Sequence, residues 1–304
     1  MICAAGGAIP LSPGRFCVLG EVVVKISVAS GKGGTGKTMV AVGLAVAAES
    51  AVLVDCDAEA PNCHIFLRKG DPEVHEVFVP VPQVDASRCS LCGACAQACR
   101  FNALAVAGGK VILFDKLCHG CGVCTAVCPS GAVQEVKRKV GVVEVDEDGS
   151  LVVVTGRLDV GEATPVPVIK AAKRLAPSAG ITIVDCAPGT SCAVVEAVKD
   201  SDLCLLVTEP TPFGLHDLRM AADTLAELEI PAAVVVNRSD GEDAGVREFC
   251  RTRGLAIAAE LPVDRRAAES YAVGKHPSLE HEEWRRAFRR LLCTVTRTAS
   301  GREC

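Results

Sequence analysis

Two runs of cysteine residues have the spacing of metal ligands. Both runs read C-x2-C-x2-C-x3-C, and the second repeats the first 29 positions further along the chain. The cysteines are Cys89, Cys92, Cys95 and Cys99 in the first run, and Cys118, Cys121, Cys124 and Cys128 in the second. Thiolates at this spacing hold a pair of 4Fe–4S clusters, because three ligands of a run bind one cluster and the trailing fourth binds its neighbour. The sequence therefore predicts one cluster on Cys89, Cys92, Cys95 and Cys128, and another on Cys118, Cys121, Cys124 and Cys99.

Chain length, composition and spacing argue against two other uses of these cysteines, namely disulfide bonds and zinc binding. The chain has 304 residues, 18 cysteines and 49% hydrophobic residues, which is ample for a core, whereas disulfide-dense proteins are small domains that lack one. A zinc site is the other alternative, but zinc sites use C-x2-C pairs separated by a longer loop. The pattern thus favours a two-cluster ferredoxin module in a reducing compartment. One departure is Arg100, which stands where the second run has Pro129.

A glycine-rich stretch at 31–38 could bind phosphate. It fits G-x-x-x-x-G-K-S/T, and its residues are Gly31, Lys32, Gly33, Gly34, Thr35, Gly36, Lys37 and Thr38. In such a P-loop the glycines let backbone N–H groups surround the phosphates, the lysine before the hydroxyl (Lys37) binds the β and γ oxygens, and the hydroxyl (Thr38) reaches Mg²⁺. A chance glycine-rich turn is the alternative. The strand expected before the motif and the helix expected after it favour a nucleotide site.

Polar residues also follow other apolar runs. Asp185 ends the run 181–185, the position expected for a carboxylate that binds Mg²⁺. Asp57 follows another such run, and either aspartate alone could be an ordinary residue at a strand end. Asn237 and Asp240 belong to an N-R-S-D segment that resembles the guanine-binding N-K-x-D motif, so we expect them to hold the base of the nucleotide.

The order of the apolar segments predicts the fold class. Runs without alternation, which are typical of strands buried on both faces, occur at 22–29, 51–55, 181–185, 203–208 and 232–237. Helical patterns lie between them at 38–50, 168–175 and 215–228. Strands that alternate with helices in this way predict an α/β fold with a doubly wound parallel sheet.

The cysteine-rich segment interrupts this alternation. We expect residues 85–132 to form an inserted ferredoxin-like domain with two 4Fe–4S clusters, and residues 21–84 and 133–304 to form one discontinuous P-loop ATPase domain. After the insertion, 136–158 alternates like an antiparallel hairpin that returns the chain to the sheet. Residues 1–20 show no pattern and are expected to be a disordered extension.

The P-loop sequence KGGTGKT resembles the deviant Walker A motif of the MinD/ParA/Mrp superfamily, which includes the nitrogenase iron protein. The resemblance implies that the chain hydrolyses ATP rather than GTP, and that Lys32 reaches across a nucleotide-sandwich dimer to the partner's phosphates; a solvated loop lysine is the alternative. It also implies that Asp57 positions the attacking water and, with Thr38 and Asp185, contacts Mg²⁺. The N–H of Gly189 would sense the γ-phosphate. The expected catalytic residues are therefore Lys32, Lys37 and Asp57.

Charge and hydropathy limit the partners and the location. The net charge of −5, from 32 basic and 37 acidic residues, gives no electrostatic support for a nucleic-acid partner. Without a signal-peptide pattern or an apolar run long enough to span a membrane, we expect a cytoplasmic protein. The segment 282–292 predicts a helix with one apolar face, and we favour its packing on the sheet over the membrane attachment seen in MinD relatives.

Together these patterns predict an ATP-driven switch coupled to electron transfer through the two clusters. The insertion point, directly after the Asp57 segment, motivates this hypothesis. The expected partners are a second copy of the chain or a paralogue, in a nucleotide-dependent dimer, and a redox protein that the sequence does not identify. An iron–sulfur carrier or scaffold, and a positioning switch with redox-sensing clusters, are the alternatives. Cys192 has the offset of the nitrogenase iron protein's cluster cysteine, but no second ligand is evident and we interpret it as structural.

Overall fold

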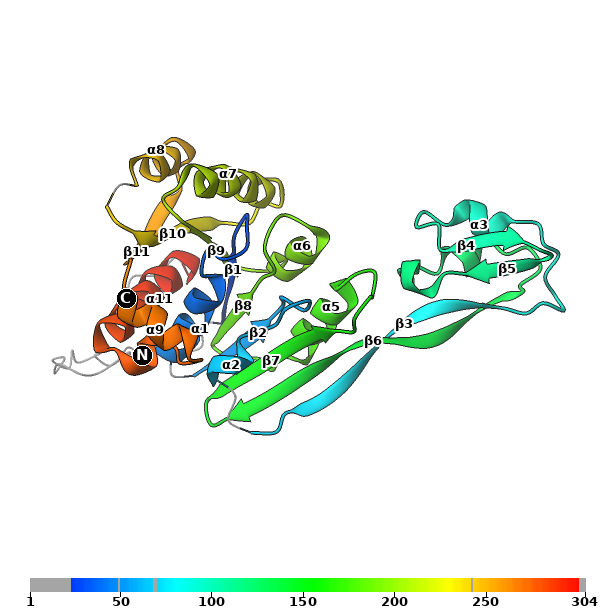
Figure 1. Ribbon diagram of the computed structural model, residues 1–304, viewed down its shortest axis with the longest axis horizontal. Coiled ribbons are helices and arrows are strands. Elements are labelled where there is room, and N and C mark those ends of the chain that lie inside the picture. The colour runs from blue at the N-terminus through cyan, green and yellow to red at the C-terminus, as the bar shows by residue number, and fades with distance from the viewer. Residues whose placement is uncertain (1–22, 49, 68–69, 242, 301–304) are drawn as a thin grey trace, which may run out of the picture.

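The computed structural model describes residues 23–48, 50–67, 70–241 and 243–300, so the extension expected at 1–20 lies outside the described residues. The described residues form a nine-stranded sheet with helices on both faces, and a small lobe at the end of a two-stranded arm (Figure 1). The predicted α/β class with a large, mostly parallel sheet is confirmed.

The strands of the sheet follow an order that requires crossover connections. Across the sheet they are β11 (Ala256–Pro262), β10 (Ala232–Ser239), β9 (Leu203–Thr208), β1 (Val24–Ala29), β8 (Ile181–Asp185), β2 (Ala51–Asp55), β7 (Leu151–Leu158), β6 (Val133–Asp148) and β3 (Glu73–Val84). Neighbours from β11 to β7 pair in parallel, whereas β6 and β3 are antiparallel. The predicted parallel sheet therefore continues at this end into antiparallel strands. The central strands β2, β8 and β9 are buried throughout, as their continuous apolar runs predict.

Helices cover both faces of the parallel part of the sheet (Figure 1). One face carries α1 (Lys37–Ala48), α9 (Arg265–Ala272), α10 (Pro277–Glu280) and α11 (Glu282–Ser300). The other carries α5 (Val166–Leu175), α6 (Cys192–Val198), α7 (Pro212–Glu227) and α8 (Ala244–Arg253). The short helix α2 (His64–Leu67) follows β2. Each face has its own hydrophobic cluster, so the sheet is the middle layer of three.

The C-terminal helix α11 packs on α1 and the sheet rather than presenting its apolar face to solvent. Trp284, Phe288 and Leu291 are buried in the same cluster as α1. Phe288 lies so close to α1 that a Cβ on Gly43 would be 2.5 Å from its ring. The predicted packing of this helix is confirmed. Among the described residues, no helix combines the length and the hydropathy that a membrane crossing needs.

Strands β3 and β6 extend beyond the sheet as a two-stranded arm (Figure 1). They pair antiparallel along the whole of β3, from Glu73 opposite Val145 to Val84 opposite Val133. Twelve residues of strand reach about 40 Å. The predicted hairpin within 136–158 is confirmed as β6 and β7, but β3 and the extension of β6 to residue 133 were not predicted.

Residues 85–132 connect the two strands of the arm and form the lobe at its tip. The elements of the lobe are α3 (Ala94–Ala98), β4 (Leu104–Ala107), β5 (Lys110–Leu113), a 3₁₀ turn η1 (Asp115–Leu117) and α4 (Val123–Ala126). Its hydrophobic cluster has only three buried members, Cys95, Leu104 and Val133. A lobe with so small a core needs another source of stability, such as bound metal.

Replacing Phe288 by Ala tests the packing of α11. We expect Phe288→Ala to lower the free energy of unfolding by about 3–5 kcal/mol, because the side chain is fully buried and its removal leaves a cavity. Phe213→Ala is the matched control, since Phe213 is 79% exposed and its loss should cost within about 0.5 kcal/mol. Urea unfolding followed by circular dichroism measures both. Equal effects of the two substitutions would contradict the packing.

Candidate functional site

The predicted nucleotide residues meet at the carboxyl edge of the parallel strands. The P-loop follows β1, Asp57 follows β2, Asp185 ends β8 and Asn237 lies near the end of β10. Since parallel strands end on the same side of a sheet, residues far apart in sequence are brought to one edge. A cavity of about 550 Å³ opens there, a size typical of small-molecule sites.

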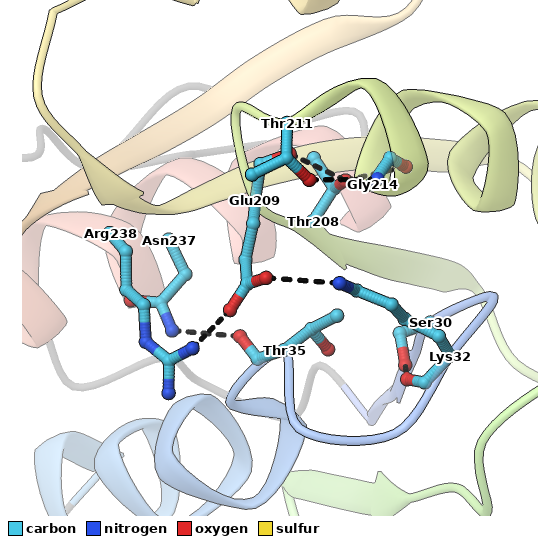
Figure 2. Close-up of polar contacts among 9 residues, drawn as sticks. All are labelled: Ser30, Lys32, Thr35, Thr208, Glu209, Thr211, Gly214, Asn237 and Arg238. Carbon is cyan, nitrogen blue, oxygen red and sulfur yellow. Dashed lines mark hydrogen bonds and ion pairs between the residues drawn. The ribbon is translucent and has the colours of Figure 1, made fainter.

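The P-loop is shaped by its glycines and held by Asn237. Gly36 has a φ of 95°, in the left-handed region that favours glycine, and a Cβ there would lie 2.3 Å from the amide nitrogen of Asn237. That amide donates a hydrogen bond of 2.7 Å to the carbonyl oxygen of Thr35 (Figure 2). Asn237 is buried, so its amide braces the loop as well as lining the cavity.

The cavity is lined by residues from several distant segments of the chain. The P-loop contributes Gly33, Gly34, Gly36, Lys37 and Thr38; Asp57, Asn62 and Pro188 lie opposite; and Asn237, Arg238, Pro262, Val263 and Asp264 continue the wall. Among the described lining residues, neither Asp240 nor Gly189 is present. Asp240 is exposed, and the N–H of Gly189 donates to the carbonyl oxygen of Ser30 at 2.9 Å. Four other predicted residues, Gly31, Lys32, Thr35 and Asp185, also lie outside the lining, although Asp185 contacts it through the Thr38 hydroxyl.

Thr38 and Asp185 offer oxygen ligands for a divalent cation. The hydroxyl of Thr38 donates to Oδ2 of Asp185 at 2.7 Å. Asp185 is fully buried, and its Oδ1 has no hydrogen-bond partner among the described residues. Burial raises the pKa of Asp185, and the neighbouring Asp55 raises it further. A buried carboxylate oxygen without a partner, next to a hydroxyl, fits the hard oxygen ligands that Mg²⁺ prefers.

Asp55 supports the loop that carries Asp57. We call residues 56–63 the Asp57 loop. One carboxylate oxygen of Asp55 accepts from the N–H of Asp57 at 3.1 Å, and the other accepts from Asn62 and Cys63, both at 2.9 Å. The thiol of Cys63 donates to Asp185 at 3.3 Å. The ends of the Asp57 loop are thus tied to two buried carboxylates, and our sequence analysis did not predict this role for Asp55.

Asp57 itself lies on the cavity wall and is only partly buried. Burial raises the pKa of Asp57, while the positive charge of Lys37 opposes that shift. A carboxylate in this position can accept a hydrogen bond from a water next to a bound phosphate.

Lys32 is held by an acidic residue of its own chain. Its Nζ lies 3.1 Å from Oε2 of Glu209, which follows β9, while Oε1 of Glu209 accepts from Arg238 (Figure 2). The Glu209 side chain lies between these two cations. It is only 11% exposed, so its charge is largely shielded from water. Neither Glu209 nor Arg238 was predicted, although a charged residue directly after a buried strand marks the functional edge of such a sheet.

The cysteines of the lobe surround two small pockets. The first cysteine pocket is lined by Cys89, Cys92, Cys95 and Cys128, and the second cysteine pocket by Cys99, Cys118, Cys121 and Cys124. These are the two ligand sets that the spacing predicts, with the last cysteine of each run exchanged. All eight are free thiols.

The repeat is visible in the local geometry of the cysteines. The N–H of Ala103 donates to the sulfur of Cys99 at 3.3 Å, and the N–H of Ala132 donates to the sulfur of Cys128 at the same distance. The hydrogen bond with the Ser130 hydroxyl, followed by the backbone N–H groups around Ala132, lowers the pKa of Cys128 to about 7. Four converging thiols in an apolar pocket fit the ligand set of a 4Fe–4S cluster. Cys192 is exposed at the start of α6, outside both pockets.

A P-loop at the carboxyl edge of a parallel sheet, with acidic residues on neighbouring strands, defines a P-loop nucleotide-binding protein. The chain matches the CobQ/CobB/MinD/ParA nucleotide binding domain over residues 26–277, and it belongs to this family. It is 29% identical over 256 residues to the uncharacterized protein MJ0579 of Methanocaldococcus jannaschii, covering 82% of this chain and 90% of that protein. It is 31% identical over 222 residues to protein MJ0578 of the same organism, covering 71% and 79%.

Solved structures of MinD proteins have a similar fold. The septum site-determining protein MinD of Pyrococcus horikoshii, complexed with Mg-ADP, matches with a TM-score of 0.57 and 18% identity, over 91% of this chain and 98% of that chain. The cell division ATPase MinD of Pyrococcus furiosus matches with a TM-score of 0.57 and 20% identity, over 90% and 99%.

Alanine substitutions at two P-loop glycines test the geometry of the loop. We expect Gly36→Ala to lower the free energy of unfolding by about 1–3 kcal/mol, because of its left-handed backbone and its contact with Asn237. Gly33→Ala is the matched control, because a Cβ there meets nothing within 4 Å and should change stability by less than about 1 kcal/mol. Urea unfolding without added nucleotide measures both. A larger loss for Gly33→Ala would contradict this loop conformation.

Proposed function

We propose that this protein hydrolyses ATP and couples the resulting conformational switch to electron transfer through two 4Fe–4S clusters. One observation supports the iron–sulfur half above all others: the eight cysteines line two pockets in the predicted sets of four. In this proposal residues 85–132 are an inserted ferredoxin domain, and residues 21–84 and 133–304 are the ATPase domain. Such clusters persist in a reducing compartment, so we place the protein in the cytoplasm.

The nucleotide half of the proposal assigns roles to residues around the cavity. Lys37 and the P-loop N–H groups would bind the phosphates, while Thr38 and Asp185 would hold Mg²⁺ and Asp57 would position water. The N–H of Gly189 would reach the γ-phosphate only by leaving Ser30, its acceptor in this structure. Family membership and a MinD neighbour complexed with Mg-ADP support ATP over GTP. The exposed position of Asp240, away from the cavity lining, argues against guanine binding by this residue.

The second part of the proposal is a nucleotide-dependent dimer. Lys32 would reach the phosphates bound by a second copy or a paralogue, as the deviant Walker A motif implies. Two relatives from one organism support the possibility of paralogous partners. To reach a partner, Lys32 must leave Glu209, and Arg238 would then remain to compensate the charge of Glu209.

A regulatory or positioning switch is the main competing function. The cell-division names of the MinD neighbours favour it. It predicts nucleotide-dependent dimerisation that responds to cluster oxidation, without electron delivery to a partner. A carrier of clusters fits less well, because four cysteines line each pocket and would leave no open coordination position for transfer.

Iron analysis tests the assignment of the cysteines. After anaerobic reconstitution we expect about eight irons per chain and the absorption and electron paramagnetic resonance spectra of 4Fe–4S clusters. Cys89→Ala should destabilise the cluster of the first cysteine pocket, while the second cluster keeps its spectrum. Cys192→Ala is the control and should retain all the iron, because Cys192 lies outside both pockets. A reconstituted wild-type protein without iron, or one that holds zinc instead, would refute the assignment.

Releasing Lys32 from Glu209 should promote dimerisation. We expect Glu209→Gln to strengthen the dimer formed with a slowly hydrolysed ATP analogue by at least about fivefold, because an ion pair of about 1 kcal/mol no longer holds Lys32 on its own chain. Analytical ultracentrifugation measures the dissociation constant. Glu248→Gln, which removes a carboxylate from an exposed pair with Arg251, is the control. Dimerisation that weakens in Glu209→Gln would contradict this role of Glu209.

A further inference from the structure

The carboxylate of Glu162 links the loop after β7 to the cysteine lobe. Glu162 lies in the loop between β7 and α5, and its side chain is only 3% exposed. It accepts from Nζ of Lys116 at 2.5 Å and from Nη1 of Arg138 at 2.6 and 2.7 Å. Lys116 belongs to η1 in the lobe, whereas Arg138 belongs to β6 in the arm. Glu162 therefore connects three segments that are far apart in sequence.

Both cations that bind Glu162 lie close in structure or sequence to Cys118, which lines the second cysteine pocket. Arg138 donates through Nη2 to the carbonyl oxygen of Cys118 at 3.4 Å. Lys116 stands two residues before Cys118, and the N–H of Cys118 donates to the carbonyl oxygen of Asp115 at 3.0 Å. A displacement of Glu162 would consequently move the backbone that presents Cys118. No residue that lines the first cysteine pocket takes part in the described contacts of Glu162.

The opposite side of the same loop is attached to the Asp57 loop. The N–H of Leu158, the last residue of β7, donates to the carbonyl oxygen of Ala58 at 2.8 Å, and Ala58 is adjacent to Asp57. The next residue, Asp159, donates to the carbonyl oxygen of Val140 on β6 at 2.9 Å. Only a few residues of chain therefore separate the Asp57 loop from Glu162, and they are fixed to the arm on the way.

Glu162 is costly to separate from both of its cations, because its own side chain is only 3% exposed. Burial alone would raise the pKa of Glu162, but the hydrogen bonds and charges of Lys116 and Arg138 keep it below its ordinary value. Separating Glu162 from the cations would leave a desolvated charge without a partner, which is strongly unfavourable. The contact is therefore expected to move as a unit rather than to break when the Asp57 loop shifts.

We propose that Glu162 is a positioning residue that transmits nucleotide-dependent movement of the Asp57 loop to the Cys118 segment, and hence to the second cysteine pocket rather than the first. This inference rests on the proposed function and deepens it. It names the route of coupling, and it predicts that nucleotide affects the second cysteine pocket but not the first. A purely structural ion pair would hold the lobe in place without making the Cys118 segment respond to nucleotide.

Hydrogen–deuterium exchange of the full-length, iron-loaded protein tests this route. Exchange is compared with and without Mg²⁺ and a non-hydrolysable ATP analogue, in peptides that cover 31–38, 85–95 and 114–124. In the wild type we expect protection of 31–38, a change of at least about threefold in the exchange rate of 114–124, and little change in 85–95. In Glu162→Gln we expect the same protection of 31–38 but no response of 114–124.

Two further variants separate a transmitting role from a structural one. Lys116→Ala removes one of the two cations and should give an intermediate response, while Arg138 keeps the lobe attached. Glu144→Gln removes a carboxylate from another ion pair of β6, with Arg157, and should respond like the wild type. Iron content per chain, measured for every variant, shows whether the lobe remains folded.

The outcomes distinguish this inference from the proposal on which it rests. If 31–38 is protected and 114–124 responds equally in the wild type and Glu162→Gln, the route through Glu162 is wrong and coupling stands. If 31–38 is protected but neither cysteine segment responds in the wild type, coupling and its route are both refuted. If 31–38 does not respond at all, nucleotide binding at the P-loop is refuted, together with everything that depends on it.

Discussion

The parallel pairing of β2 with β7 is the constraint on which the proposed coupling depends. Asp55 at the end of β2 stands opposite Thr155, so the Asp57 loop emerges beside the last residues of β7. Because β7 also pairs with β6, the same register fixes the root of the arm that carries the cysteine lobe. The nucleotide site and the arm that carries the cysteine lobe are thereby connected to one continuous sheet. Hydrogen-bonded strands cannot slip by one residue without reversing every side chain, so this relation is rigid.

Buried carboxylates lie both at the nucleotide site and at the contact with the cysteine lobe. Asp55 and Asp185 are buried beside the P-loop, where burial raises the pKa of both and a divalent cation would stabilise their charged forms. Glu209 and Glu162 are each desolvated between two cations. Buried ion pairs add little to stability compared with apolar packing, but breaking one is costly. Such pairs therefore favour discrete rearrangements over gradual loosening, which suits a switch.

The sequence predicted the features that depend on local pattern. The P-loop and the cysteine sets follow fixed spacings, whereas Asp57 and Asp185 were predicted from their places after apolar runs and from the family resemblance. The arm was missed because Pro80 and Pro82 argue against a strand, although β3 is the edge strand, where proline is tolerated. The place of Glu209 after β9 carries a signal, but the ion pairs of Glu209 and Glu162 could not be predicted, since their partners are distant in sequence. The N-R-S-D segment predicted that Asp240 holds the base of the nucleotide, but the structure leaves this residue outside the cavity lining.

The central claim is that nucleotide binding changes the chemistry of a cluster in the same chain. Its most direct test is a redox titration of both clusters, followed by electron paramagnetic resonance, with and without Mg²⁺ and a non-hydrolysable ATP analogue. The account predicts that one midpoint potential shifts by about 60 mV or more, a tenfold change for one electron, and that the other stays nearly constant. Two potentials that both remain unchanged while the analogue is demonstrably bound would contradict it.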